Sequence, residues 1–190
     1  MLDQRNANKL EILIVNDGSK DRTAEIGRTL EKLSTVNGRS IVRLIDKENG
    51  GHGSTINCGI RNAVGKYFKV VDGDDWVNTA DFVKLVEDLE KTESEYVFTN
   101  YYEYYDDVNR QKAVDFSQFK DGTEYDFADV ANKVCIPMHA LVIKTSVLKD
   151  NNIVIDEKCF YVDAEYVIFP LPYIQTVSAI PDFVYQYRIG

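Results

Sequence analysis

Residues 67–77 read Tyr-Phe-Lys-Val-Val-Asp-Gly-Asp-Asp-Trp-Val, so an apolar run rich in β-branched and aromatic residues stops abruptly in three carboxylates. Such a run predicts a buried β-strand. In an open α/β sheet, ligands bind outside the carboxyl ends of the strands. The acidic loop that follows this strand is therefore the expected place for a functional site.

The spacing of the acids suggests what the loop can hold. On a straight strand the Cα atoms of Asp72 and Asp74 would lie on one face, roughly 6.6 Å apart. Two oxygens on one small divalent cation lie within about 4.2 Å of each other. Side-chain reach and a bend at Gly73, which has no Cβ, can close that gap. We interpret the pair as a candidate metal clamp; a solvated acidic turn is the alternative.

Size and composition exclude several classes of protein. A chain of 190 residues suits one α/β domain with a substantial core. The formal charge of -9 argues against a nucleic-acid surface, which would show a basic stripe. There is no apolar run near 18 residues and no charged-then-apolar leader, which predicts a cytosolic chain without a transmembrane segment. Cys58, Cys135 and Cys159 are odd in number and lack zinc-type spacing, so we expect reduced thiols.

Strand and helix patterns alternate through the first half of the chain. This order predicts an α/β fold with a mostly parallel sheet, right-handed crossovers and flanking helices. Asn78 or Thr79 is placed to cap the third helix. Apolar runs predict strands over 10–16, 41–45 and 67–71. Apolar side chains at helical spacing predict helices over 24–33, 56–64 and 79–89.

Polar loops follow the first two strands. Asp17-Gly18-Ser19 ends the first strand, and Asn49-Gly50-Gly51 follows the second, just before a helix. Backbone amides of a glycine-rich loop can approach an anion, assisted by the helix dipole. A structural turn is the alternative. The loop lacks the Gly-Lys-Ser/Thr of a Walker loop.

The second half changes to aromatic and antiparallel character. A long aromatic strand is predicted over 96–105, and its tyrosines either line a sugar-binding face or pack across strands. His139 either approaches a bound substrate or is a core or edge histidine. Short helices are also predicted at 126–132 and after Thr145. Further strands are predicted over 138–143, 174–180 and 183–188.

A second acidic element lies at 160–169, where two acids precede an apolar run. If this segment is helical, Asp163 and Glu165 diverge by roughly 200° around the helix axis. Only one of them can then face a shared site.

Several of these pieces, in this order, resemble the inverting glycosyltransferase family 2, which has the GT-A fold. The family shows a strand that ends in Asp-Gly-Ser, an Asn-Gly-Gly loop with its helix, a D-x-D-D-W segment, a later acidic element and a closing Tyr-x-Tyr-Arg. The corresponding residues here are 12–23, 48–51 with 57–60, 72–76, 160–166 and 185–188. The resemblance covers residues 10 to 188.

The resemblance implies a role for each motif. Asp17 would hydrogen-bond the nucleotide base, Asp72 would sit by the ribose or the metal, and Asp74 would bind Mg²⁺ or Mn²⁺ that bridges the diphosphate. Asp163 would be the catalytic base. The residues implied to bind the nucleotide sugar are Asp17, Gly18, Ser19, Asn49, Gly50, Gly51, Asp72 and Gly73, and those implied to bind the metal are Asp72 and Asp74.

The family also implies partners. The donor would be a nucleotide sugar, most simply a UDP-sugar, and the acceptor a hydroxyl of a cell-surface glycan or a lipid-linked saccharide. The expected organisation is one domain, with the donor half at 10–92 and the acceptor half at 93–190. The implied location is the cytoplasm, with peripheral association at the inner face of the cell membrane as the alternative.

Two departures from the family keep other readings open. The family begins with a strand and loop of the type Val-x-Val-Pro-x-Tyr-Asn, and this sequence begins just after it. Ile56 stands where the family commonly has an Arg near the diphosphate, which leaves the metal, Lys47, His52 or Arg61 to neutralise charge. The alternatives are a nucleotide-binding or structural fragment without turnover, and a nucleotidyltransferase, which would usually show a basic glycine-rich loop.

Overall fold

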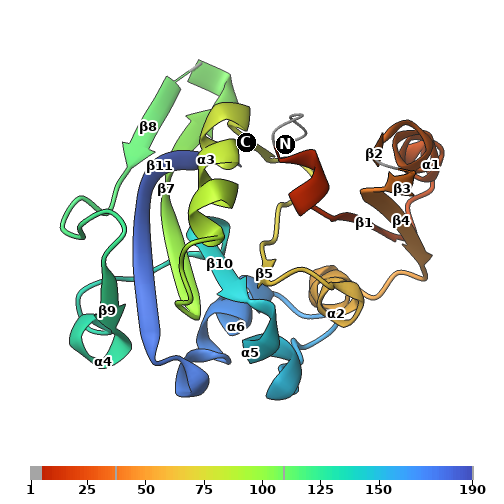
Figure 1. The fold of residues 1–190 in the computed structure, drawn as a ribbon. Helices are drawn as coiled ribbons and strands as arrows, with labels where there is room; N and C mark the ends of the chain where they lie inside the picture. The colour runs from red at the N-terminus through yellow and green to blue at the C-terminus, as the bar shows by residue number, and fades with distance from the viewer. Residues whose placement is uncertain (1–5, 37, 109, 190) are drawn as a thin grey trace.

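A computed structural model describes residues 6–36, 38–108 and 110–189. Figure 1 shows a small sheet with α1 on one side of the molecule, a larger sheet on the other, and α2 between them. The strands of these two sheets form no ladder with each other. The fold class predicted from the sequence is confirmed: an α/β domain with helices beside mixed sheets and antiparallel strands in its second half.

The small sheet contains the first two predicted strands. β1 (Ile12–Asp17) pairs in parallel with β4 (Val42–Lys47), and the predicted helix between them is α1 (Thr23–Leu33). A short antiparallel pair lies between α1 and β4, and a 3₁₀ turn precedes β1; these are β2 (Thr35–Val36), β3 (Arg39–Ser40) and η1 (Ala7–Lys9).

The larger sheet has the strand order β5-β10-β7-β11-β6, with β8 beside β7 and β9 beside β11. β7 and β11 pair in parallel, and the other pairs of this sheet are antiparallel. Its strands are β5 (Tyr67–Phe68), β6 (Trp76–Val77), β7 (Tyr96–Tyr105), β8 (Arg110–Val114), β9 (Glu124–Asp126), β10 (Leu141–Lys144) and β11 (Thr176–Ile189).

The predicted helices are present, with bounds that differ by a few residues. Asn78 is the N-cap of α3, and its side-chain oxygen accepts hydrogen bonds from the Ala80 and Asp81 N–H groups. The helices after β4 are α2 (His52–Asn62), α3 (Thr79–Leu89), α4 (Phe127–Val130), α5 (Thr145–Asp150) and α6 (Val162–Ile168), with 3₁₀ turns η2 (Asp106–Val108), η3 (Met138–Ala140) and η4 (Leu171–Tyr173).

The main core lies around β7, β10 and β11, whose central side chains are fully buried. Tyr96 of β7 is one of them, and Tyr101 is also buried. Farther along β7, the ring of Tyr102 stacks on Phe183 of β11 with centroids 4.5 Å apart. These tyrosines therefore pack against neighbouring elements, as one of the two sequence alternatives predicts.

Three strand predictions are corrected. The strand expected over 67–71 forms a ladder only at β5, because a cavity of about 680 Å³ separates residues 67–73 from β1. Residues 138–140 form η3, so that strand begins at Leu141. The two strands expected over 174–188 are one strand, β11, with register shifts between Ile180 and Tyr185. Pro181, which has no N–H for a ladder, lies at that irregularity.

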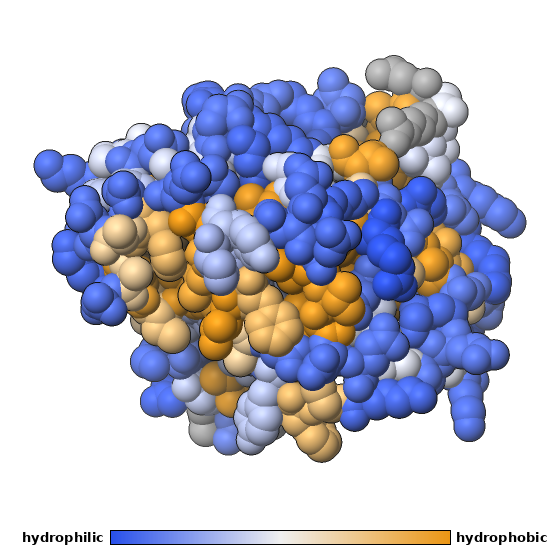
Figure 2. Space-filling view, turned by 90° about the horizontal axis from the view of Figure 1, so that it is seen from below, coloured by the Kyte–Doolittle hydropathy of each residue, from blue (hydrophilic) through white to orange (hydrophobic). Residues whose placement is uncertain are grey.

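Figure 2 shows the face on which α5 and α6 lie, seen from below, with apolar side chains gathered among hydrophilic ones. Large exposed apolar side chains of residues 154–173 are Val154, Phe160, Tyr161, Ile168, Phe169 and Tyr173. In the part of the chain that the structure describes, no helix has the length and apolar character needed to cross a membrane.

Replacing Leu141, which is 0% exposed in the middle of the larger sheet, tests this core. We expect Leu141→Ala to lower the free energy of unfolding by about 2–5 kcal/mol, because it leaves a cavity in the main core. Urea denaturation followed by circular dichroism measures the change. Leu33→Ala is the matched control, since Leu33 is 76% exposed, and should cost well under half as much. Equal losses in the two variants would contradict the assigned core.

Candidate functional site

The acidic loop after β5 is held in place by a buried tyrosine of β11. The Asp72 N–H donates to the Tyr185 hydroxyl at 3.1 Å, and that hydroxyl donates to Asp75 Oδ2 at 2.6 Å. The Arg188 N–H donates to Asp75 Oδ1 at 2.7 Å. Burial, followed by the bond to Asp75, raises the pKa of Tyr185, so the hydroxyl stays protonated and can donate. Asp75 is thus a structural acid that fixes the loop.

The two acids predicted to bind metal remain at the surface of this loop. Asp72 Oδ1 lies 3.1 Å from His52 Nε2, at the first position of α2. The hydrogen bond to Asp72 raises the pKa of His52. Asp74 is exposed, and its carboxylate has no hydrogen-bond partner among the described residues.

The end of β1 closes onto the glycine-rich loop. Asp17 Oδ1 accepts from the Gly50 N–H at 2.9 Å, and Oδ2 accepts from the Gly51 N–H at 2.8 Å. The Lys47 ammonium also donates to Asp17. Burial would raise the pKa of Asp17, but these hydrogen bonds together lower it. Lys47 therefore neutralises Asp17 in this structure.

The turn residues on both sides of this contact are also in place. The Asn49 side-chain amide donates to the Asp17 carbonyl at 3.0 Å, and the Ser19 N–H donates to the Asn16 side chain at 3.2 Å. Gly18 has φ +73°, and a Cβ there would approach the Asn49 backbone nitrogen to 3.0 Å. The residues predicted for donor binding at Asp17–Ser19 and Asn49–Gly51 are thus brought together by the fold.

An arch formed by residues 155–161 connects this loop to α6. Asn57 of α2 holds the backbone of Ile155 through two hydrogen bonds, at 2.8 and 2.9 Å. The Lys158 N–H donates to the Gly50 carbonyl at 3.1 Å. Tyr161, at the N-terminus of α6, has φ +63°, an uncommon backbone conformation for a side-chain-bearing residue. The start of α6 is therefore positioned by the glycine-rich loop.

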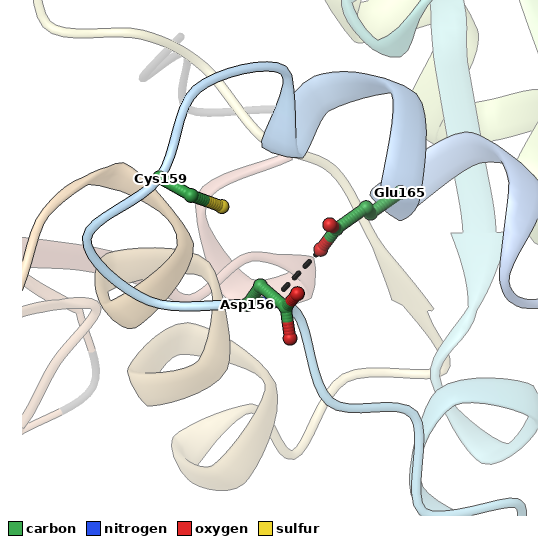
Figure 3. A group of neighbouring side chains, drawn as sticks. All are labelled: Asp156, Cys159 and Glu165. Atoms are coloured by element: carbon green, nitrogen blue, oxygen red, sulfur yellow. Dashed lines mark hydrogen bonds between the residues drawn. The ribbon is translucent and has the colours of Figure 1, made fainter.

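The helical alternative for residues 160–169 is confirmed, and it separates the two acids. Glu165 accepts from the Asp156 N–H at 2.8 Å, as Figure 3 shows, so Glu165 closes the arch. Asp163, in the first turn of α6, is exposed, and its side chain has no hydrogen-bond partner in the described part of the chain. Asp163 is the acid left available for chemistry.

Among the described residues, one group of three side chains has the ligand spacing of a metal site: Asp156, Cys159 and Glu165, whose ligand atoms lie within 4.8 Å of one another (Figure 3). It lies on the arch, and the predicted pair Asp72 and Asp74 is not part of it. Two of its three members are exposed, and Glu165 already accepts a backbone hydrogen bond.

Asp72 and Asp163 influence the same two side chains, His52 and Tyr187 of β11. The hydrogen bond to Asp72 is the largest cause of the raised pKa of His52, and the negative charges of Asp72 and Asp163 raise that pKa further. Burial is the largest cause of the raised pKa of Tyr187, and the same two charges add to it. Tyr187 stacks on His139 with centroids 4.5 Å apart. Burial lowers the pKa of His139 to about 4, so its ring is neutral and is part of an aromatic cluster with Tyr185 and Tyr187.

Sequence reasoning missed the roles of Tyr185 and Asn57. Both lie in motifs that the sequence singled out, the closing Tyr-x-Tyr-Arg and the helix after Asn-Gly-Gly. Their partners are more than ninety residues away, so local spacing carried no signal of the contact. The need of a buried tyrosine hydroxyl for a partner was the only available hint.

Adding a methyl group at Gly53 tests the contact between α2 and the arch. A Cβ there would lie 2.0 Å from the Asp156 carbonyl oxygen, so Gly53→Ala must displace the arch. We expect a loss of about 1–3 kcal/mol in the free energy of unfolding and shifted amide resonances over 155–163. Gly65→Ala is the control, because its nearest neighbour would be 3.5 Å away. Unchanged resonances on the arch would contradict the contact.

Removing the Tyr185 hydroxyl tests the clamp on the acidic loop. Tyr185→Phe keeps the ring but leaves the Asp72 N–H and the Asp75 carboxylate without this partner. We expect a stability loss of about 1–3 kcal/mol and faster hydrogen exchange at the Asp72 amide, measured by NMR. Tyr187→Phe, for which no side-chain hydrogen bond is found among the described residues, serves as the control. Equal exchange at Asp72 in both variants would rule the clamp out.

Comparison with known proteins finds relatives among bacterial glycosyltransferases. A glycosyltransferase of Bacillus subtilis (strain 168), EpsJ, is 39% identical over 93 residues, which cover 49% of this chain and 26% of EpsJ. An uncharacterised glycosyltransferase of Haemophilus influenzae is 25% identical over 188 residues, covering 95% of this chain and 56% of that protein. The chain thus spans between about a quarter and about half of these relatives.

Solved structures show the same fold. The crystal structure of S. aureus TarS 1–349 in complex with UDP-GlcNAc matches 97% of this chain and 51% of that chain, with a TM-score of 0.72 at 20% identity. This likeness confirms the GT-A fold expected from the sequence. The model of the family described as "Glycosyl transferase family 2" matches residues 1–151. Because the match covers more than half of the sequence, the chain belongs to glycosyl transferase family 2.

Proposed function

We propose that this chain carries the donor and base side of an inverting glycosyltransferase, which moves a sugar from a UDP-sugar to an acceptor hydroxyl. The observation that carries the proposal is that the acidic loop and the arch that leads to α6 both contact the start of α2, through Asp72 with His52 and through Lys158 with the Gly50 carbonyl. Asp163, an exposed carboxylate, lies in the first turn of α6 at the end of that arch. Family membership and the UDP complexes of TarS, a structural neighbour, support this reading.

In this proposal the donor lies against the ends of β1 and β5. The loops at 17–19 and 49–51 contact the nucleotide, and the N-terminus of α2 attracts the diphosphate through its dipole and His52. Asp74, which is exposed and has no partner among the described residues, would hold a Mg²⁺ or Mn²⁺ ion together with Asp72, because such ions typically take one or two carboxylates together with substrate phosphates. The bound ion would supply positive charge that stabilises the departing diphosphate.

Asp163 acts as the general base. Its carboxylate takes the proton of the acceptor hydroxyl while the acceptor oxygen forms a bond to the anomeric carbon. The bond from that carbon to the diphosphate oxygen breaks in the same displacement, and the diphosphate keeps the electron pair. A single displacement inverts the configuration at the sugar. Glu165 cannot share the role while it holds the Asp156 amide.

The acceptor side is formed by the second half of the chain. Phe160 is 90% exposed and Tyr161 is 83% exposed, immediately before the helix that carries Asp163. Exposed aromatic rings beside a proposed base suit the apolar face of a sugar ring. The acceptor in this proposal is a growing cell-surface glycan or a lipid-linked saccharide, reached from the cytoplasmic side of the membrane.

Asp163→Asn separates chemistry from donor binding. We expect sugar transfer by the enzyme to fall about 10²–10⁴-fold, because the amide cannot take a proton, while UDP affinity measured by calorimetry changes less than twofold. Asp129→Asn, an exposed acid on α4, is the control and should leave both unchanged. Transfer that survives Asp163→Asn would overturn the assignment of the base. Binding without transfer in the unsubstituted chain would favour the fragment alternative.

A further inference from the structure

Trp76 is the only tryptophan of the sequence, and its ring is open to solvent beside the acidic loop. It follows that loop directly and pairs with Gln186 in the short ladder between β6 and β11. The next residue, Val77, is 7% exposed, whereas Trp76 is 39% exposed. A tryptophan side chain is highly buried on average, so an open ring at this position indicates a contact with a ligand.

The strand register places Trp76 on one face of the larger sheet, at the end where β8, β7 and β11 lie side by side (Figure 1). Paired residues of neighbouring strands point to the same face, and successive residues of one strand point to opposite faces. The ladders pair Gln186 with Trp76 and with Tyr102, Arg188 with Tyr104, and Tyr104 with Gln111. Tyr185 and Tyr187 of β11 therefore lie on the opposite face, where both rings approach His139.

Contacts between side chains agree with this assignment. The Tyr104 ring meets Trp76 edge-on, with centroids 5.4 Å apart, and the Arg188 guanidinium lies 5.8 Å from the centroid of the Trp76 ring. Arg188 also pairs with Asp106 at 2.9 Å. The Gln111 side-chain amide donates to a side chain of β11 at 3.2 Å. We call Trp76, Tyr104, Asp106, Gln111 and Arg188 the Trp76 face.

The chemistry of the Trp76 face suits a neutral saccharide. An aromatic ring offers an apolar surface to the C–H groups of a pyranose ring. Gln111 and Arg188 are exposed and carry planar sets of N–H donors, and exposed Asp106 offers acceptor oxygens for hydroxyl groups. Because Asp106 pairs with Arg188, the five side chains of this face carry no net charge that would select a phosphate or sulfate. One ring bordered by polar groups is too small an apolar area for a lipid or an amphipathic helix.

The Trp76 face adjoins the candidate site. The Arg188 N–H donates to Asp75 Oδ1 at 2.7 Å, so β11 holds the acidic loop beside this face. The Cα atoms of Asp74 and Trp76 are at most about 7 Å apart, because two residues of extended chain span no more than that. A saccharide with one end at the acidic loop can therefore lie on Trp76.

We propose that the Trp76 face is a binding site for a neutral saccharide, in which a pyranose ring of the acceptor stacks on Trp76. The occupant is a β-linked chain of gluco-configured rings. Such rings carry axial hydrogens on both flat faces and equatorial hydroxyls on the rim, where Asp106, Gln111 and Arg188 bond them. The stacked ring lies away from the reacting hydroxyl, so the Trp76 face sets the affinity for the acceptor. That the saccharide is the acceptor rests on the proposed function, whereas the face itself rests on register and contacts.

Intrinsic fluorescence is the first test, because a sequence with one tryptophan reports on this face without any variant. We expect cellotetraose and chitotetraose to shift the emission to shorter wavelength as the ring is covered, and to saturate with a Kd of about 1 mM or tighter. No saturable shift with either oligosaccharide up to about 10 mM would overturn the proposal.

Two neighbouring residues of β8 provide the matched variants. Gln111 belongs to the Trp76 face, whereas Lys112 points to the opposite face and pairs with Glu103. We expect Gln111→Ala to raise the Kd for the oligosaccharide about fivefold or more, because an amide donor is lost. Lys112→Ala should change the Kd less than about twofold, since it removes an exposed ion pair on the other face. Equal effects of the two variants would overturn the proposal.

Kinetics separate this inference from the proposed function. With an oligosaccharide acceptor, Gln111→Ala should raise the KM for the acceptor about fivefold or more while kcat and the KM for the UDP-sugar stay unchanged. Saturable saccharide binding that depends on Gln111, without any sugar transfer, would support the binding site and contradict the proposed function. Sugar transfer with the same acceptor KM in Gln111→Ala and in the unsubstituted protein would overturn the binding site.

Discussion

The hydroxyl of Tyr185 is the contact on which the candidate site depends. It accepts from the Asp72 amide and donates to the Asp75 carboxylate, so one buried group sets the path of the loop that carries Asp72 and Asp74. The Asp75 carboxylate is engaged in this bond, so two of the three acids of the loop, Asp72 and Asp74, stay available for a ligand. What remains is a pair of carboxylates at the surface, held by a strand in the core of the larger sheet.

A second chain of contacts brings the remaining acid to the same place. Asp17 binds the amides of Gly50 and Gly51, the Gly50 carbonyl binds Lys158, and the arch from Ile155 leads to α6 and Asp163. The Asp17 carboxylate and the Lys158 N–H both bond to backbone groups of the glycine-rich loop, and at Gly53 the contact with the arch leaves no room for a side chain. The glycines of this loop therefore allow the end of β1 and the arch before α6 to lie close to the start of α2. The same glycines would allow a phosphate to approach the backbone.

Local sequence patterns predicted the elements well and their long-range contacts poorly. Periodicity located α1, α3 and the whole of β7, and the Asn78 cap followed from residue type alone. The helix over Val162–Ile168 separates Asp163 from Glu165, as the spacing of the two acids predicts. The pattern could not show that residues 69–71 lie outside a ladder, because a β-branched run looks the same whether or not a neighbouring strand is present. Nor could it show that Pro181 interrupts the register of one strand without ending it.

Among the described residues, two acidic groups at different positions are candidates for holding a metal ion. One is Asp72 with Asp74 on the acidic loop; the other is Asp156 with Cys159 and Glu165 on the arch. Paramagnetic broadening of amide NMR signals by Mn²⁺ in the presence of UDP distinguishes them most directly. We predict that broadening centres on residues 72–74 and extends to His52 and Asp163, and that Asp74→Asn weakens it. Broadening centred on residues 156–159, with residues 72–74 unaffected, would contradict this account of the site.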